Sequence, residues 1–309
     1  MGANEANAIE QHMSIGAVER DTGLSKDTLR VWERRYGFPE PARDDNGERV
    51  YPPEQVEKLR LIRRLMDNGH RPGKIIGQPV EELRLLAESE REPADEALEG
   101  VLRLLIGHES AELKRALSQR LVRQGLQRFV TETVAPLNTL VGDAWMGGQL
   151  AVFEEHLYTE VMQGLLRSAI SSAQHPGLPP RILLCSLPGE EHCLGLLMAE
   201  ALLTVEGAAC IPLGTQVPAA DVAKAARAHR ADVVALSFSA AFPTRNAVTH
   251  LIDLRAMLPE RFGLWAGGAG IARQNKEVAG VTIVKSLDDL LAVLAAWRAT
   301  HAGNLPASH

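Results

Sequence analysis

The residues best suited to chemistry stand in one short turn, Gly189-Glu190-Glu191-His192-Cys193-Leu194-Gly195. The turn lies between an apolar run, Arg181 to Leu187, and a helical run, Leu194 to Val205. A histidine after the first strand of an open α/β sheet lies where such sheets bind ligands, beyond the carboxyl ends of the strands. Imidazole is a common ligand of transition metals, and a carboxylate such as Glu190 can fix its tautomer and raise its basicity. We therefore expect His192 to reach a metal.

The C-terminal part of the chain alternates apolar and helical runs, which indicates a doubly wound parallel sheet. Strands are predicted at Arg181 to Leu187, Ala208 to Leu213, Asp232 to Phe238, Phe262 to Ala266 and Val281 to Val284. Helices are predicted at Leu194 to Val205, Pro218 to His229, Thr244 to Leu258 and Leu287 to Ala299. Because the strands are parallel, the ends of the first, third and fourth strands should converge on one edge of the sheet.

Two further polar or small-residue signals fall at those strand ends. Ser237 and Ser239 close the third strand, and Gly267-Gly268 close the fourth. Hydroxyls can hydrogen-bond a polar ligand, and glycines permit close approach of the backbone. Serines also end strands routinely, and the glycines can form a simple turn. A nicotinamide cofactor is disfavoured, because the first strand is followed by Pro188 to His192 and lacks the G-x-G-x-x-G fingerprint.

The N-terminal part contains a helix-turn-helix pattern. A short helix is predicted from Ser14 to Arg20, followed by a tight turn, and Ser25 is the N-cap of a second helix that runs to about Arg35. Leu29 and Trp32 form the inward face of the second helix. The residues of this helix that can contact a DNA groove and its phosphates are Lys26, Thr28, Arg30, Arg34 and Arg35.

A hairpin follows the second helix, with the turn signal Asn46-Gly47 at its tip. Ser14 to Asp67, with this hairpin as a wing, resembles the DNA-binding domain of the MerR family. The resemblance implies that Arg30 and Arg34 contact the groove or phosphates. It also implies wing contacts to DNA from Arg43, Arg49 and Tyr51. A surface-charged helical hairpin without nucleic acid is the alternative interpretation. Gly69 to Pro79 is expected to be a short linker, because no long coiled coil follows this domain.

The middle segment has a helical pattern throughout, which predicts a bundle of four or five helices. Its helices are expected at Val80 to Ser89, Ala94 to Gly107, Ser110 to Arg123, Gln124 to Met146 and Val152 to Ala173. Within it, Trp145 is followed after nine residues by Glu155-His156. A tryptophan offers a flat face to a purine, and a glutamate can hydrogen-bond a ribose or adenine edge. A structural tryptophan and a solvated Glu-His pair are the plainer interpretation.

Composition limits the remaining possibilities. The 309 residues suffice for two or three domains, and 45% of them are hydrophobic. The net charge of −6 gives no general nucleic-acid signature, and residues 1–78 balance 13 Lys or Arg against 13 Asp or Glu, so a DNA-binding face must be local. No apolar run long enough for a membrane span and no signal-like N-terminus is seen, so a cytoplasmic protein is expected. Three cysteines without paired spacing are expected to be small core residues.

The spacing Glu190-x-His192-x-x-Gly195 resembles the axial-ligand motif of cobalamin-binding domains. The resemblance implies that His192 is the lower axial ligand of cobalt and that Gly195 leaves room for the cofactor tail. It also implies that the nucleotide tail lies among Ser237, Ser239, Gly267 and Gly268. The distances fit the family, with 41 residues between Gly195 and Ser237, although Ser239 stands where leucine is usual.

The spacing of Trp145 and Glu155-His156 resembles the upper-face motif of the CarH-type, light-sensing cobalamin regulators. The order of the three segments resembles this family over nearly the whole chain. The resemblance implies a multidomain α and α/β protein with a winged helix-turn-helix in 1–78, a helical bundle capping the cofactor in 79–175 and a Rossmann-like cobalamin-binding domain in 176–309. It further implies that His156 becomes a second axial ligand after light.

The function implied by this resemblance is a transcriptional repressor and not an enzyme. It would bind adenosylcobalamin, assemble into a homotetramer in the dark, hold double-stranded operator DNA and release it on photolysis. Two alternatives remain open. One is a regulator whose cobalamin-like domain works without the cofactor, or with another, as a protein-interaction module. The other is a corrinoid-dependent methyltransferase or mutase subunit, which does not explain the MerR-like N-terminus.

Overall fold

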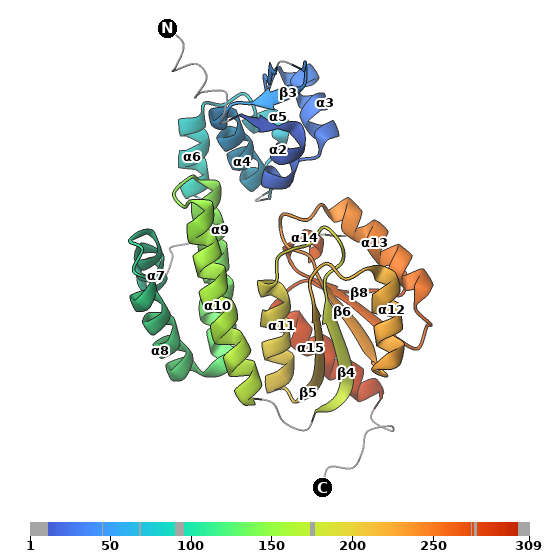
Figure 1. Ribbon diagram of the computed structural model, residues 1–309. Coiled ribbons are helices and arrows are strands. Elements are labelled where there is room, and N and C mark those ends of the chain that lie inside the picture. The colour runs from blue at the N-terminus through green and yellow to red at the C-terminus, as the bar shows by residue number, and fades with distance from the viewer. Residues whose placement is uncertain are drawn as a thin grey trace. The chain divides into compact units, whose positions relative to one another are not determined.

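The computed structural model describes residues 12–44, 46–67, 69–89, 96–173, 177–272, 274 and 277–301, and Figure 1 shows the elements in chain order. The chain divides into two compact units. One contains the residues up to Glu99 together with Leu140–Glu155, and the other contains Gly100–Thr139 together with the residues from His156 onward. In the part of the chain that the structure describes, no helix is both long and apolar enough to cross a membrane.

The N-terminal elements form a winged helix-turn-helix. They are β1 (Met13–Ser14), α2 (Ile15–Thr22), α3 (Lys26–Tyr36), β2 (Ala42–Arg43), β3 (Arg49–Tyr51), α4 (Pro53–Asp67), α5 (Pro72–Ile75) and α6 (Val80–Ser89). The strands make an antiparallel sheet in the order β1-β3-β2. Ser14 and Ser25 cap α2 and α3 through their hydroxyls, as the sequence predicts for Ser25. Helix α3 ends at Gly37, whose φ of 67° suits glycine best.

The core of this head domain contains the residues predicted to face inward, since Leu29 and Trp32 are buried. Three expectations are corrected. Helix α6, expected in the helical bundle, packs on the head, with Leu83 and Ala87 buried in the head core. The stretch expected to be a linker contains α5, and Ile75 and Ile76 are buried in the same core. The hairpin is also wider than its two-residue turn signal indicates, because the last paired residues are Arg43 and Arg49.

The helical segment consists of α7 (Glu96–Ile106), α8 (Ser110–Phe129), a π-helical turn (Val130–Val134), α9 (Ala135–Met146) and α10 (Val152–Ala173). The predicted start at Ala94 lies outside the described residues. The break predicted after Arg123 occurs two residues later, where Gly125 has non-helical angles of φ 73° and ψ 164°. Within the second unit, α8 and the π-helical turn pack against the first helix of the sheet domain.

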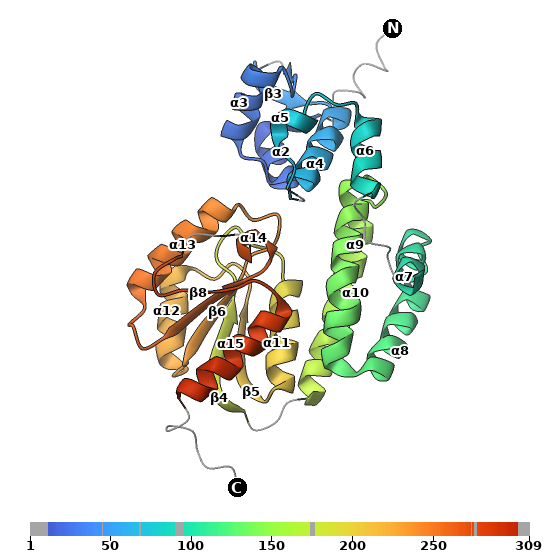
Figure 2. The same cartoon turned by 180° about the vertical axis from the view of Figure 1, so that it is seen from behind.

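The C-terminal elements form a five-stranded parallel sheet between two helical layers (Figures 1 and 2). The strands are β4 (Leu178–Cys185), β5 (Ala208–Gly214), β6 (Val233–Ser237), β7 (Gly263–Gly267) and β8 (Thr282–Val284). The helices are α11 (Leu194–Val205), α12 (Ala219–Ala228), α13 (Thr244–Met257), α14 (Ala269–Ala272) and α15 (Leu287–Thr300). The strand order is β5-β4-β6-β7-β8, as in flavodoxin-like sheets.

Alternation along the strands explains the two layers. In β4, Ile182 and Leu184 belong to the core cluster on the side of α11 and α15, whereas Leu183 and Cys185 belong to the cluster on the side of α12 and α13. Both faces of the sheet are therefore covered, as parallel sheets require. In the sheet domain, the predicted strands and helices are all present, with boundaries that differ by at most three residues.

Candidate functional site

The chain reverses its direction of winding between β4 and β6, and open α/β sheets bind ligands beyond the carboxyl ends of the strands at such a point. The loop after β4 carries Glu190 and His192, and the loop after β6 carries Ser239. The next strand in the sheet, β7, ends at Gly267. The structure therefore brings the three predicted motifs to one edge, which we call the ligand edge.

Glu190 is the anchor of this edge. It is 1% exposed, and its Oε1 accepts a hydrogen bond from the backbone N–H of His192 at 2.9 Å. Its Oε2 accepts one from the backbone N–H of Ser239 at 2.6 Å. Burial alone would raise the pKa of Glu190, but the hydrogen bonds from His192 and Ser239 outweigh it and lower the pKa below its ordinary value. The carboxylate is therefore ionised at neutral pH and ties the two loops together.

The imidazole of His192 is oriented by this carboxylate. Its Nδ1 lies 2.7 Å from Oε1 of Glu190, while the side chain as a whole is 60% exposed. An ionised carboxylate only accepts hydrogen bonds, so the proton belongs on Nδ1 and the neutral ring carries its lone pair on Nε2. This is the arrangement in which a histidine ligates a metal with a carboxylate as its second partner.

Ser239, the departure from the cobalamin-binding pattern, belongs to the same polar network. Besides its backbone bond to Glu190, its Oγ lies 3.0 Å from Nδ1 of His192. A leucine at this position would keep the backbone contact and remove the hydroxyl. The substitution therefore changes the surroundings of the histidine as well as the expected tail site.

Ser186 is a structural residue of the edge that the sequence did not single out. Ser186 is fully buried. Its Oγ donates a hydrogen bond to the carbonyl of Glu190 at 2.8 Å and accepts one from the backbone N–H of Gln216 at 3.2 Å. It thereby fixes the turn that carries Glu190. A serine inside the apolar run Arg181 to Leu187 was the available signal, because a buried hydroxyl needs partners.

The glycines of the motifs stand where side chains do not fit. A Cβ on Gly195 would lie 2.5 Å from Oγ of Ser237, and a Cβ on Gly268 would lie 2.3 Å from the carbonyl oxygen of Phe238. Gly268 also has a φ of 94°. At Gly267 the nearest atoms of Val284 would be 3.4 Å away. Glycine at these positions lets the loops that carry Gly195 and Gly268 pack closely against Ser237 and Phe238.

A metal at this edge would have His192 as its ligand from this chain. Among the described residues, no group of three or more His, Cys, Asp or Glu side chains is placed to hold an ion. Burial raises the pKa of both Cys185 and Cys210 to about 12, which keeps these thiols protonated. One oriented imidazole with a 60% exposed side chain fits a metal that brings its other ligands with it, as cobalt does in cobalamin.

The predicted upper-face residues occupy two helices. Trp145 stands at the C-terminal end of α9 and is half-buried. Near the start of α10, Glu155 is half-buried and His156 is exposed. Trp145 and Glu155 belong to the first unit, and His156 belongs to the second.

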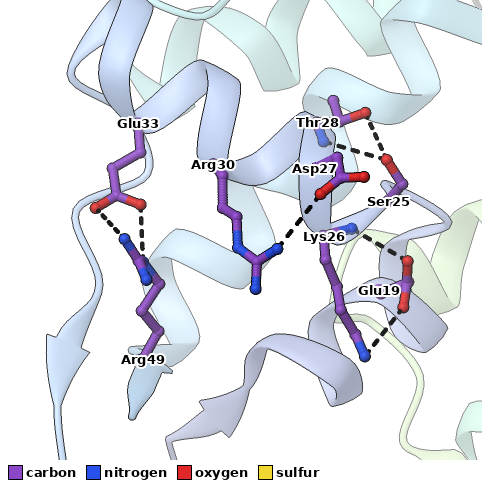
Figure 3. Close-up of polar contacts among 8 residues, drawn as sticks. All are labelled: Glu19, Ser25, Lys26, Asp27, Thr28, Arg30, Glu33 and Arg49. Carbon is purple, nitrogen blue, oxygen red and sulfur yellow. Dashed lines mark hydrogen bonds and ion pairs between the residues drawn. The ribbon is translucent and has the colours of Figure 1, made fainter. Parts of the chain in front are cut away.

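On the head domain, helix α3 presents most of the predicted DNA contacts to solvent. Lys26, Arg30, Arg34 and Arg35 are exposed. Figure 3 shows that two of these cations are paired with acids of the same domain. Nζ of Lys26 lies 3.7 Å from Glu19, and the guanidinium of Arg30 lies 3.3 Å from Asp27.

The other predicted DNA contacts have structural partners. Thr28 belongs to the N-cap, with its Oγ1 2.8 Å from Oγ of Ser25. Arg43 is exposed on the wing, and Arg49 donates two hydrogen bonds to Glu33 of α3 at 2.9 and 3.3 Å (Figure 3). This ion pair raises the pKa of Arg49 and joins the wing to the recognition helix.

Tyr51 is a correction. The resemblance implied a wing contact to DNA, but the side chain is fully buried in the head core. Burial raises the pKa of its hydroxyl, and no described residue hydrogen-bonds to it. Arg49 and Tyr51, two residues apart in β3, share the face of the strand that turns toward α3. Tyr51 therefore supports the position of the wing from within.

Three family models match successive parts of the chain. The MerR HTH family regulatory protein matches residues 13–77, and two B12 binding domain families match residues 97–169 and 180–290. Among solved structures, the chain is similar to the monomethylamine corrinoid protein of Methanosarcina barkeri, with a TM-score of 0.52 and 15% identity. That match covers 65% of this chain and 98% of the corrinoid protein, and it confirms the fold.

Two curated relatives match nearly end to end. The chain is 32% identical to the HTH-type transcriptional repressor CarH of Myxococcus xanthus, over 87% of this chain and 92% of CarH. It is 30% identical to the HTH-type transcriptional repressor CarA of the same organism, over 91% of this chain and 96% of CarA. The predicted family and fold class are thus confirmed. The chain belongs to the CarH-like family of MerR-type transcription regulators with B12-binding domains.

Proposed function

We propose that this protein is a light-responsive transcriptional repressor that binds operator DNA in the dark with adenosylcobalamin bound, and releases the DNA on photolysis. The observation that supports this most directly is the orientation of His192 by the buried carboxylate of Glu190 at the ligand edge. That feature stands in the same chain as a winged helix-turn-helix of the MerR type. The two relatives that match nearly end to end carry the name of repressors.

In this proposal, His192 ligates cobalt from below through Nε2, and Glu190 holds the ring in the required tautomer. Gly195 and Gly268 are assigned places beside the nucleotide tail, where they present no side chain to it. Further contacts to the tail are assigned to Ser237, Ser239 and Gly267. Adenosylcobalamin would supply visible absorption and a cobalt–carbon bond that light breaks.

The helical segment is assigned the upper side of the cofactor. Trp145 and Glu155 would contact the adenosyl group, and His156 would offer the cobalt a second imidazole once light has removed that group. The chain then has three functional parts. They are a DNA-binding head in 1–78 that α6 extends, a cap in the rest of 79–175 and a cobalamin-binding domain in 176–309. The dark form is a homotetramer in the cytoplasm.

DNA binding is assigned to the exposed cations of the head. Lys26, Arg30, Arg34 and Arg35 on α3 and Arg43 on the wing contact the groove or the phosphates. Lys26 and Arg30 are paired with Glu19 and Asp27 in the free protein. On binding DNA, these two ion pairs break and the cations contact phosphates instead. Such binding weakens as salt rises, by counterion release.

The test begins with the purified chain and adenosylcobalamin in darkness. We expect a bound-cobalamin absorption spectrum and a large assembly in solution, and after green light a changed spectrum and a smaller assembly. His192→Ala should weaken binding and remove the spectral signature of histidine ligation, whereas Glu191→Gln, on the exposed neighbour of Glu190, should not. If the wild-type chain takes up no corrinoid, a cofactor-independent regulator replaces this proposal.

A further inference from the structure

Within the first unit, helix α4 of the head lies against the C-terminal end of α9. The guanidinium carbon of Arg60 is 5.2 Å from the centroid of the Trp145 ring. The same guanidinium donates two hydrogen bonds to Asp21 of α2, at 2.8 and 2.9 Å. Arg60 thus contacts both the first helix of the helix-turn-helix and the tryptophan of the predicted upper-face motif.

A second arginine of α4 strengthens this contact. The Nη2 atom of Arg64 lies 2.9 Å from Oδ2 of Asp143 on α9, and it also donates to the carbonyl of Ala87 at 3.4 Å. The side chains of Arg64 and Asp143 are only 14% and 15% exposed. Ion pairs this sheltered are screened by salt much less than exposed ones. The head is therefore fixed to this end of α9 by two arginines that lie one helical turn apart on α4.

The double contact of Arg60 depends on guanidinium chemistry. A planar guanidinium can bind a carboxylate with its edge and cover an aromatic ring with its face at the same time. A lysine ammonium keeps the charge but cannot do both in this geometry. Since Asp21 is 10% exposed, it has little water to replace Arg60 as a partner. A movement of the Trp145 ring that displaces Arg60 would therefore alter the Arg60–Asp21 pair.

We propose that Arg60 is a positioning residue that transmits the state of Trp145 to the DNA-binding head. This rests on the proposed function, which gives Trp145 a contact with the cofactor. A ligand that reorients the ring or takes the face covered by Arg60 alters the Arg60–Asp21 pair and with it the setting of α2 against α4. By linkage, DNA binding changes cofactor affinity by the same factor as the cofactor changes DNA affinity.

The test compares wild type, Arg60→Lys and Arg60→Gln with the matched control Arg115→Gln. Arg115 forms an exposed ion pair with Glu112 on α8, outside this contact. For each protein the dissociation constant of a fluorescent duplex, selected in vitro with the wild-type chain, is measured in the dark with and without adenosylcobalamin. Cofactor affinity is measured with and without the duplex.

For wild type and Arg115→Gln we expect cobalamin to change DNA affinity by about fivefold or more, in the range of typical allosteric coupling. In Arg60→Lys and Arg60→Gln, the ratio of the DNA dissociation constants without and with cobalamin should fall to within about twofold of one. Arg60→Lys should still bind the duplex and adenosylcobalamin separately. A wild-type ratio in Arg60→Lys would overturn the inference. A ratio of one in the wild-type chain would instead overturn the proposed function.

A second readout needs no cofactor. In the apo-protein, Arg60→Lys should speed amide hydrogen exchange in α2 and in the end of α9 that carries Trp145, relative to wild type and Arg115→Gln. Trp145→Phe, which keeps a weaker aromatic partner for Arg60, should give an intermediate rate in α2. Unchanged exchange in α2 for both variants would show that the contact transmits nothing to the helix-turn-helix, whatever the cobalamin measurements give.

Discussion

The ligand edge and the DNA-binding head both pair a base with an acid, but they do so at opposite depths. At the ligand edge the acid, Glu190, is 1% exposed and ties two loops together through backbone N–H groups. On the head, the acid partner of Arg30 is Asp27, whose side chain is 90% exposed. One pair is built into the fold, and the other lies on its surface.

The difference matches what each site must do. Exposed ion pairs contribute about 0.2–1 kcal/mol, so phosphates can exchange for the acids of the head at little cost. A buried acceptor that loses its donors costs about 1–3 kcal/mol for each unsatisfied group, so the ligand edge keeps its geometry before any ligand arrives. The head is therefore suited to reversible binding, and the edge to holding a ligand in a preset position.

The largest effect is expected where the edge is most rigid. Gly268→Ala would place a methyl group 2.3 Å from the Phe238 carbonyl oxygen at a φ of 94°. Strain and clash together should lower the free energy of unfolding of the sheet domain by about 3 kcal/mol or more. Gly37→Ala is the control on the head, since its φ is 67° with open space around it, and about 1 kcal/mol is expected. Urea unfolding measures both, and equal effects would contradict the comparison.

Breaking the anchor itself should come next. Glu190→Gln keeps the size of the side chain, but it replaces one carboxylate oxygen by an NH₂ group. That donor then faces the backbone N–H donor of either His192 or Ser239, and one hydrogen bond is lost. We expect a loss of about 1–3 kcal/mol in unfolding free energy and a 10- to 100-fold loss of cobalamin affinity. The control Glu191→Gln, on an exposed neighbour, should stay within about 0.5 kcal/mol of wild type. Calorimetric binding and urea unfolding at pH 7 distinguish the two variants.

The pH dependence of stability follows from the lowered pKa of Glu190. An acid whose pKa is lower folded than unfolded stabilises the fold above its unfolded pKa, about 4.3, and loses that contribution as pH falls through the folded value. The stability difference between wild type and Glu190→Gln should therefore be complete at pH 7 and shrink below about pH 4. A difference that stays constant down to pH 3 would show that the carboxylate charge contributes nothing.

Much of the fold was predictable, because period-two and helical patterns fix which elements form and parallel strands place their ends together. The three motif sites met at one edge for that reason. What the pattern could not show is which backbone groups a buried acid holds. The bonds from Ser239 and His192 to Glu190 depend on how two loops, far apart in sequence, close over each other.

The failures have physical causes as well. Tyr51 looked like a wing contact because it follows Arg49 on β3. The face of β3 that these two residues share turns toward α3, and the ring of Tyr51 lies in the head core. Ile75 and Ile76 lay in a Gly- and Pro-containing stretch that resembled a linker, but two adjacent isoleucines are apolar enough to join the head core. Arg60 gave no sequence signal at all, because its contact with Trp145 connects separate parts of the chain.

A smaller change is expected from restoring the family residue at the ligand edge. Ser239→Leu keeps the backbone N–H that Glu190 accepts and removes the hydroxyl 3.0 Å from Nδ1 of His192. Stability should stay within about 1 kcal/mol of wild type, because the half-buried side chain makes one hydrogen bond at most. The visible spectrum of bound cobalamin, which reports on axial ligation, should shift relative to wild type. An unchanged spectrum would mean that Glu190 alone sets the histidine.

The smallest effect on folding, and the clearest test of the exchangeable pairs, belongs to Asp27→Asn on α3. Removing an exposed acid 3.3 Å from Arg30 should change the unfolding free energy by at most about 0.5 kcal/mol. DNA affinity should rise a few-fold at low salt, because the phosphates no longer compete with a carboxylate for the guanidinium. Asp221→Asn, which breaks a similar i,i+3 pair with Lys224 on α12, should leave DNA affinity unchanged. Arg30→Ala should reduce the dependence of log affinity on log salt by about one. If Asp27→Asn weakened binding instead, the carboxylate would be a DNA contact in its own right, accepting a hydrogen bond from a base such as cytosine.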